Sequence, residues 1–237
     1  MASRQGVTNR GGARPRVVES LEGRSGTLIL FERETPLGKR YEITIGGHFV
    51  MAASDGPTER RLSRAVLSRI DRSEGIAVFV GGLGLGLTLM ETLSDPRVEQ
   101  VIVAEIEEAI IRWNRTYLRQ FNEGAVLDGR VAIRCTDVLN VMGKKWRAFD
   151  AVLMDVDNGP TFLVFEGNAP LYTVRGLRRI RRSLKRGGVL GIWSNRPDDL
   201  LMENLKAAFG NAEVELIADE NLREDLPPTA IYTSVRR

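Results

Sequence analysis

The clearest signal in the chain is Val78-Phe79-Val80-Gly81-Gly82-Leu83-Gly84-Leu85-Gly86-Leu87-Thr88, an apolar run that leads through glycines into a helix pattern. Glycines let a chain turn tightly and let its backbone approach a ligand closely, and the N–H groups of the next helix then face that ligand. We therefore predict a ligand-binding loop at Gly81, Gly82, Gly84 and Gly86. The spacing is tighter than the dinucleotide fingerprint and suits a nucleoside with a short charged tail. The alternative is a plain strand-to-helix turn.

Around this loop, apolar strand patterns alternate with amphipathic helix patterns. Such alternation predicts βαβ units and a mostly parallel sheet with helices on both faces. The last two strands are joined by a polar segment too short for a crossover helix, which predicts an antiparallel last strand. The predicted strands cover residues 76–80, 100–105, 131–135, 151–154, 189–193, 212–218 and 229–235. The predicted helices cover residues 58–70, 85–93, 107–121, 171–186 and 198–209.

The first part of the chain has a different pattern. Short β patterns at 27–34, 40–45 and 48–53 are separated by glycine and proline turns, which predicts a small β-hairpin region. We expect a flexible basic tail over residues 1–26, this β region over 27–57, and a Rossmann-like nucleoside-binding domain over 58–237.

Acidic residues follow two further predicted strands. Glu105 ends the second strand of the domain, 19 residues after Gly86, where a carboxylate accepts hydrogen bonds from ribose hydroxyls. The nearby Glu107 fits the first turn of the next helix, where negative charge is favourable. Asp137 ends the third strand and suits either the amino group of adenine or the N-cap of a helix that starts near Val138.

The fourth strand runs into Asp155-Val156-Asp157-Asn158-Gly159-Pro160 at the same edge of the sheet. Alternation along an extended chain places Asp155 and Asp157 on one side, where mutual repulsion raises the pKa of at least one of them. Such a pair suits a cationic amine that is held and then deprotonated. A structural Asx turn is the alternative.

Composition excludes several other classes. The 237 residues carry a net charge of +3, which is too small to indicate nucleic-acid binding. The basic residues between 175 and 186 alternate with an apolar stripe, so we expect them on the solvated face of a packed helix. Cysteine and histidine each occur once, so no metal site is expected. No apolar stretch is long enough for a membrane span, and a cytoplasmic protein is the default expectation.

These motifs resemble the spermidine synthase (aminopropyltransferase) family within the class I S-adenosylmethionine-dependent methyltransferase fold. The resemblance runs from residue 27 to the end of the chain. It rests on the glycine loop, on the strand ends that carry Glu105 and Asp137, and on the aspartate-rich turn. Trp113-Asn114-Arg115 and the turn sequence D-V-D-N-G-P are most similar to a spermidine synthase-like branch of the family.

The resemblance implies a transfer of an aminopropyl group from decarboxylated S-adenosylmethionine, or a relative of it, to a small-molecule amine. Glu105 would bind the ribose, Asp137 the adenine, and Asp155 would take the proton of the attacking amine. From the position of the turn we also expect Asp157 to be catalytic and Asn158 to bind the substrate. A homodimer is also implied. Two positions depart from the family pattern, because Gly84 and Asn158 stand where the family has aspartates. Methyl transfer from S-adenosylmethionine and a non-catalytic nucleoside-binding role therefore stay open.

Overall fold

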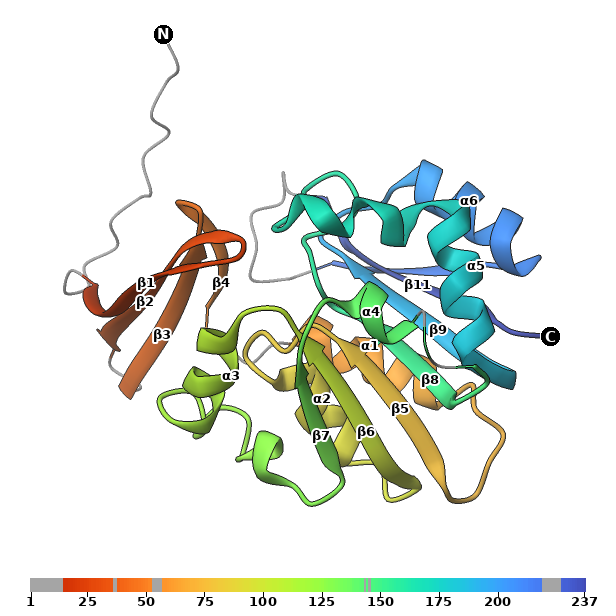
Figure 1. Ribbon diagram of the computed structural model, residues 1–237, viewed down its shortest axis with the longest axis horizontal. Coiled ribbons are helices and arrows are strands. Elements are labelled where there is room, and N and C mark those ends of the chain that lie inside the picture. The colour runs from red at the N-terminus through yellow and green to blue at the C-terminus, as the bar shows by residue number, and fades with distance from the viewer. Residues whose placement is uncertain (1–14, 36–37, 53–56, 143, 145, 219–226) are drawn as a thin grey trace, which may run out of the picture.

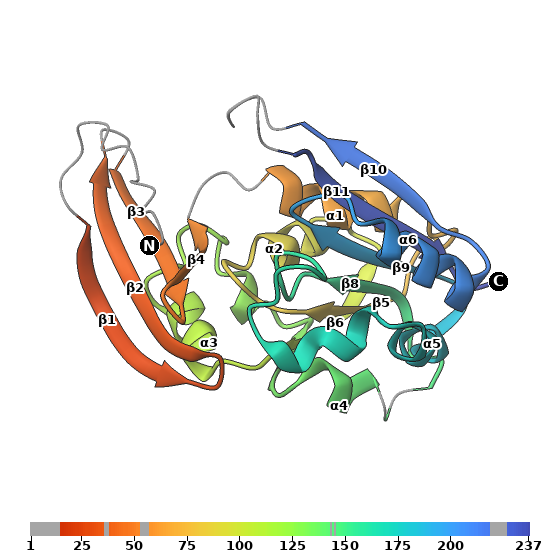
Figure 2. The same ribbon diagram turned by 90° about the horizontal axis from the view of Figure 1, so that it is seen from above.

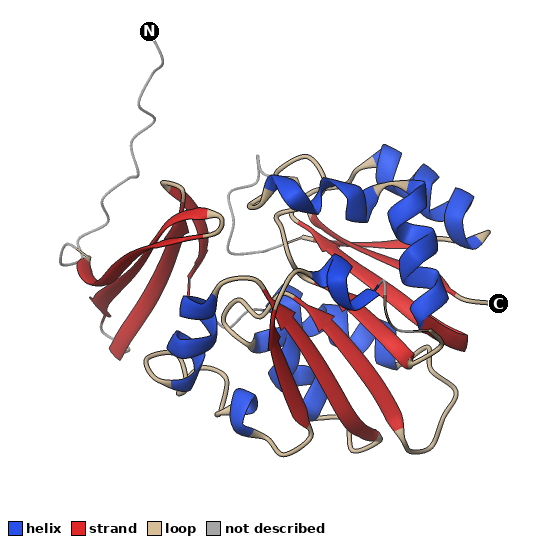
Figure 3. Cartoon of the chain, viewed as in Figure 1, coloured by secondary structure: helices blue, strands red, loops and turns tan. Residues whose placement is uncertain are grey.

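The structure is a computed structural model that describes residues 15–35, 38–52, 57–142, 144, 146–218 and 227–237. It holds two sheets: a small N-terminal one, and a large one with helices on both faces (Figures 1 and 3). No helix in these ranges is long and apolar enough to cross a membrane.

The N-terminal sheet is an antiparallel meander of four strands in sequence order. Its strands are β1 (Arg16–Gly23), β2 (Gly26–Thr35), β3 (Gly38–Ile45) and β4 (His48–Ala52). Strand β1 corrects the sequence analysis, which predicts a flexible tail over residues 1–26. Its sequence is highly polar and only partly buried, so the strand depends on its ladder with β2 and on the tight turn between Gly23 and Gly26. Residues 1–14 lie outside the described ranges.

The large sheet has seven strands in the order β10-β11-β9-β8-β5-β6-β7. Strands β5 to β9 are parallel, and β11 pairs antiparallel with both β9 and β10, which confirms the predicted α/β class and the antiparallel last strand. The bounds are β5 (Ile76–Gly81), β6 (Val98–Glu105), β7 (Val131–Cys135), β8 (Phe149–Met154), β9 (Leu184–Ser194), β10 (Glu213–Ile217) and β11 (Thr229–Val235).

Helices cover both faces of this sheet (Figure 2). One core packs α1, α2 and α3 against Val78, Val80 and their neighbours, and the other packs α4, α5 and α6 against Phe79 and Val152. Consecutive residues of β5 thus face opposite cores, as strand alternation requires. The helices are α1 (Pro57–Leu67), α2 (Leu87–Leu93), α3 (Glu108–Arg115), α4 (Val138–Met142), α5 (Val174–Ser183) and α6 (Asp199–Phe209), with short 3-10 segments η1 (Ala125–Leu127) and η2 (Glu166–Tyr172).

Two of the predicted helices are much shorter than the sequence pattern indicates. The helix predicted over 107–121 ends at Arg115, and the chain then turns back toward the glycine loop. The helix predicted over 171–186 begins only at Val174, where the Thr173 hydroxyl caps it by accepting from the Gly176 N–H at 3.1 Å. It ends where Leu184 enters β9.

From β5 the chain adds β6 and β7 on one side of the sheet, and from β8 it adds β9 on the other side. The strand order therefore reverses between β5 and β8. In open α/β sheets, ligands bind beyond the carboxyl ends of the strands at this reversal. Both the glycine loop after β5 and the aspartate turn after β8 lie at this point.

Candidate active site

The glycine loop is fitted against the end of β8. Gly82 and Gly86 have φ angles of 84° and 82°, which side chains rarely adopt. A Cβ on Gly82 would lie 2.1 Å from the carbonyl oxygen of Asp155, and one on Gly86 would lie 2.8 Å from Oδ1 of Asn114. Both positions therefore require glycine.

Two buried asparagines hold the loop from behind. Asn114 Nδ2 donates to the Gly84 carbonyl at 2.8 Å, and Asn122 Nδ2 donates to the Leu85 carbonyl at 3.1 Å and to Oδ1 of Asn114 at 2.7 Å. Both side chains are fully buried. The sequence analysis does not identify this pair, because a helix continued to residue 121 would not bring Asn122 back to the loop.

We expect the substitution Asn114→Ala to destabilise the protein by about 2–3 kcal/mol, because it leaves the Gly84 carbonyl and one of the two N–H groups of the Asn122 amide buried without a partner. Urea denaturation measures this change. The matched control is Asn140→Ala at an exposed position of α4, for which we expect less than about 0.5 kcal/mol. Equal losses in both variants would contradict the role of Asn114.

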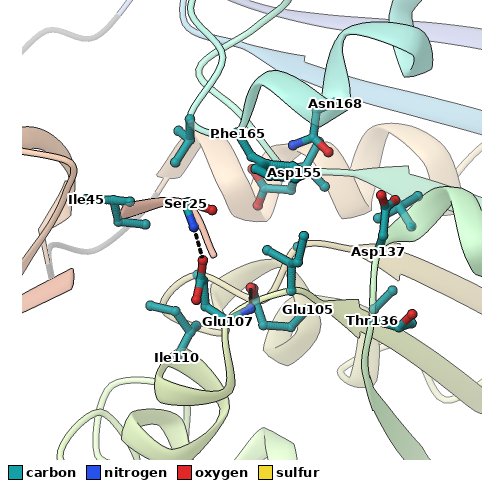
Figure 4. Close-up of a pocket in the computed structure, with 17 residues that line it drawn as sticks. Ser25, Ile45, Glu105, Glu107, Ile110, Thr136, Asp137, Asp155, Phe165 and Asn168 are labelled. Atoms are coloured by element: carbon teal, nitrogen blue, oxygen red, sulfur yellow. Dashed lines mark hydrogen bonds between the residues drawn. The ribbon is translucent and has the colours of Figure 1, made fainter. Parts of the chain in front are cut away.

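Glu105 and Glu107 are both buried but accept hydrogen bonds from different partners. Glu105 accepts from the N–H groups of Leu83 at 2.9 Å and Glu107 at 2.8 Å, and burial raises its pKa. Glu107 accepts from the N–H groups of Ser25 at 2.6 Å and Arg24 at 3.1 Å, which ties the turn between β1 and β2 to the large domain (Figure 4). A carboxylate has about four acceptor sites, so Glu105 keeps capacity for ligand hydroxyls.

Asp137 caps a helix and lines a cavity. Its Oδ1 accepts from the N–H of Leu139 at 2.7 Å at the start of α4, as an N-cap does. The side chain is only half-buried and also lines the larger of the two cavities described below.

Asp155 lies where two cavities meet. The larger cavity, of about 610 Å³, is lined by Ser25, Gly82, Glu105, Asp137, Val138, Phe165 and further residues between them (Figure 4). The smaller cavity, of about 530 Å³, is lined by Glu59, Leu85, Thr88, Asp157, Asn158, Trp193 and others. Asp155 and Gly84 line both cavities.

The environment of Asp155 changes its acidity. Burial raises its pKa to about 7, and the carboxylate of Glu59 adds to the rise, while a hydrogen bond from the Thr88 hydroxyl at 2.7 Å opposes it. The sequence analysis attributes such a rise to repulsion between Asp155 and Asp157. Instead, burial makes the largest contribution to the raised pKa of Asp155, and the charged neighbour that adds to it is Glu59. Glu59 and Thr88 were not identified from sequence, although an acidic residue in the first turn of α1 was visible.

Asp157 holds a loop. Its Oδ1 accepts from the Val164 N–H at 2.8 Å and the Asn168 amide at 3.1 Å, and its Oδ2 accepts from the Tyr172 hydroxyl at 3.0 Å. The side chain is 5% exposed. With its oxygens engaged in this way, Asp157 stabilises the segment from Val164 to Tyr172. This segment lines the larger cavity with Val164, Phe165 and Asn168, and Val164 also lines the smaller one.

The remaining predicted residues are also placed near these cavities. Asn158 lies half-buried in the wall of the smaller cavity, and its carbonyl accepts from the Asn195 N–H at 3.2 Å. Gly81 ends β5, beneath the loop. Within the described ranges, no group of three or more histidine, cysteine or acidic side chains is arranged to hold a metal ion.

The sequence of the chain is similar to one protein family and to several curated proteins. The family model for the spermine/spermidine synthase domain matches residues 59–208. A polyamine aminopropyltransferase of Nitrosomonas europaea is 33% identical over 123 residues, which is 51% of this chain and 35% of that protein. One from Saccharolobus islandicus is 29% identical over 111 residues, which is 47% of this chain and 36% of that protein. The chain thus spans about a third of the length of these curated relatives.

Solved structures show the same fold. A spermidine synthase in complex with the transition-state analogue AdoDATO superposes with a TM-score of 0.79 at 21% identity, covering 94% of this chain and 74% of that one. The spermidine synthase of Thermotoga maritima superposes with a TM-score of 0.75 at 20% identity, covering 94% and 73%.

Proposed function

The chain belongs to the spermine/spermidine synthase family, and from this premise we propose that it transfers an aminopropyl group from decarboxylated S-adenosylmethionine to a small amine. The observation that carries the proposal is the position of Asp155 between two cavities of different chemistry. One has acceptors suited to a nucleoside, and the other has acidic groups suited to an amine.

The larger cavity takes the nucleoside. Glu105 accepts hydrogen bonds from the two ribose hydroxyls, using lone pairs that its backbone partners leave free. Asp137 accepts from the adenine amino group through the oxygen that does not cap α4. Ile106, Val138 and Phe165 supply apolar contacts for the base.

The smaller cavity takes the acceptor amine. Its wall contains the carboxylates of Glu59, Asp155 and Asp157, and the described residues that line either cavity include no lysine, arginine or histidine. A protonated amine is therefore favoured over an anion. The carboxylate of S-adenosylmethionine would lack a cationic partner, which favours its decarboxylated form and so aminopropyl transfer over methyl transfer.

The reaction joins these two cavities. The amine nitrogen attacks the carbon of the propyl group that is bonded to the sulfonium. A new N–C bond forms, the C–S bond breaks, and the sulfur keeps the electron pair as neutral methylthioadenosine leaves. Before the attack, Asp155 takes a proton from the bound protonated amine, which frees the lone pair of the amine nitrogen. A base with a pKa near the working pH combines a large ionised fraction with adequate basicity, and Asp155 meets this condition.

We expect decarboxylated S-adenosylmethionine to bind at least about tenfold more tightly than S-adenosylmethionine, because the latter buries a carboxylate without a partner. Isothermal calorimetry with both compounds and with methylthioadenosine measures this. Release of methylthioadenosine in the presence of putrescine and other diamines then tests turnover. Tighter binding of S-adenosylmethionine would overturn the aminopropyl proposal, and no binding of any of the three would overturn the nucleoside site.

A further inference from the structure

Three segments rich in basic residues meet at the edge of the sheet opposite the two cavities. As far as the structure describes them, they are residues 144–149, 181–188 and 235–237, and none contains an aspartate or glutamate. The Arg147 N–H donates to the Arg182 carbonyl at 3.0 Å, and the Arg236 N–H donates to the Gly188 carbonyl at 2.8 Å. We call the surface formed by Lys144, Trp146, Arg147, Arg182, Arg186 and Arg236 the basic face.

The topology separates this surface from the site. Residues 147–149 and 184–186 lie where the parallel strands β8 and β9 begin, whereas the cavities lie where the parallel strands end (Figure 1). The antiparallel β11 ends at the same edge, which brings Arg236 there.

The positive charge of the basic face is not neutralised. Several arginines elsewhere in the large domain form ion pairs, as in Arg64 with Glu91 at 2.6 Å and Arg130 with Asp128 at 2.9 Å. At the basic face the neighbouring acid is Asp150, which is buried and already paired with Lys185 at 2.7 Å. Among the described residues, no carboxylate forms an ion pair with an arginine of the basic face.

Trp146 gives this charged surface an aromatic centre. Its side chain is 64% exposed, and the guanidinium carbons of Arg147 and Arg236 each lie 6.0 Å from its ring centroid. Arg236 is held in place by the carbonyls at the end of α5, including that of Arg181 at 3.0 Å. Burial, together with the charges of Arg147 and Arg181, lowers the pKa of Arg236, as expected where positive charges gather without a counter-charge.

We propose that the basic face binds single-stranded nucleic acid, with backbone phosphates on Arg147, Arg182 and Arg186 and a base stacked on Trp146. Guanidinium forks match phosphate geometry, and an exposed aromatic ring among cations is the arrangement that stacks unpaired bases. A bilayer would gain little here, because Trp146 is the only exposed large apolar side chain in these three segments as far as they are described. The sequence analysis does not expect nucleic-acid binding, because it considers the net charge and the helix over 171–186 separately, whereas the fold brings three segments together.

The test is fluorescence anisotropy of a fluorescein-labelled oligodeoxythymidine with the full chain. We expect binding that weakens steeply with salt, as release of counterions from phosphates requires. The double substitution Arg182→Glu and Arg186→Glu should weaken it by more than about tenfold, and Trp146→Ala by about tenfold. The matched control is Arg115→Glu, an exposed arginine of α3, which should leave affinity unchanged.

Other outcomes contradict the proposal. Absence of binding at low salt, or an equal loss in the Arg115→Glu control, would show that the basic face has no specific role. Cosedimentation with vesicles of anionic lipid, without oligonucleotide binding, would assign the face to membranes instead. Thermal melts check that each variant is folded, and aminopropyl turnover should be unchanged in the basic-face variants because the basic face lies away from the cavities.

Discussion

The substitution Asp155→Asn is expected to lower kcat by about 10²- to 10⁴-fold, the usual contribution of a positioned general base. Asparagine keeps the size of the side chain and can still accept from the Thr88 hydroxyl, but it cannot take the proton of the amine. The KM for the aminopropyl donor should change little. Initial rates of methylthioadenosine release at saturating amine measure the effect. The control is Asp71→Asn, an exposed aspartate, which should retain full activity.

The pH profile separates this role from a structural one. Since the pKa of Asp155 is about 7, the ionised base forms as pH rises, and kcat/KM of the wild type should increase through pH 7. The residual activity of Asp155→Asn should lack this limb. An unchanged pH profile in a folded variant would remove Asp155 from the reaction.

Stability should move in the opposite direction from activity. A carboxyl whose folded pKa is raised binds a proton that the unfolded chain has already released, so its contribution to stability falls as pH rises from about 4 to about 7. At pH 8 the Asp155→Asn variant escapes this cost and should be more stable than the wild type, by roughly 1–3 kcal/mol after allowance for solvent screening. Unfolding therefore does not explain its loss of activity.

The fold could be predicted from the sequence where local pattern and tertiary structure agree. The apolar runs in β5, β8 and the second half of β6 are almost entirely buried at the centre of the sheet, so their patterns are strong. Strand β1 was missed because its order comes from pairing with β2, which no local pattern records. Helix α3 was predicted too long because its end is set by the return of the chain to place Asn122 behind the glycine loop.

The same distinction holds for the site. Strand-end residues such as Glu105, Asp137 and Asp155 were predictable, because parallel strands bring their carboxyl ends to one edge. Glu59 comes from a helix outside the strand pattern, and the packing of α1 against α2 and against the sheet brings it to Asp155. The distinct roles of Asp155 and Asp157 could not be predicted from the sequence. Strand alternation places both side chains on one side but does not give their hydrogen-bond partners.

Asp157→Ala is expected to destabilise the protein by about 3–5 kcal/mol, the usual cost of leaving buried partners of a charged group unsatisfied. The variant removes the acceptor for the Val164 N–H, the Asn168 amide and the Tyr172 hydroxyl at once. The wall of both cavities should loosen, so the KM values for donor and amine should rise together. Thermal and urea unfolding, with initial-rate kinetics on the folded fraction, measure both effects.

The informative comparison is Asp157→Asn. An asparagine oxygen can still accept from Val164 and Asn168, and its amide can donate to the Tyr172 hydroxyl, so most of the network survives. We therefore expect a loss of only about 1–2 kcal/mol in stability and a kcat within about fivefold of the wild type. A loss of kcat as large as that of Asp155→Asn, in a folded protein, would instead assign proton transfer to both aspartates. Because the two substitutions are chemically identical and two residues apart, any difference between them reflects the partners of each carboxylate: one faces the open junction of two cavities, and the other is enclosed by the loop it holds.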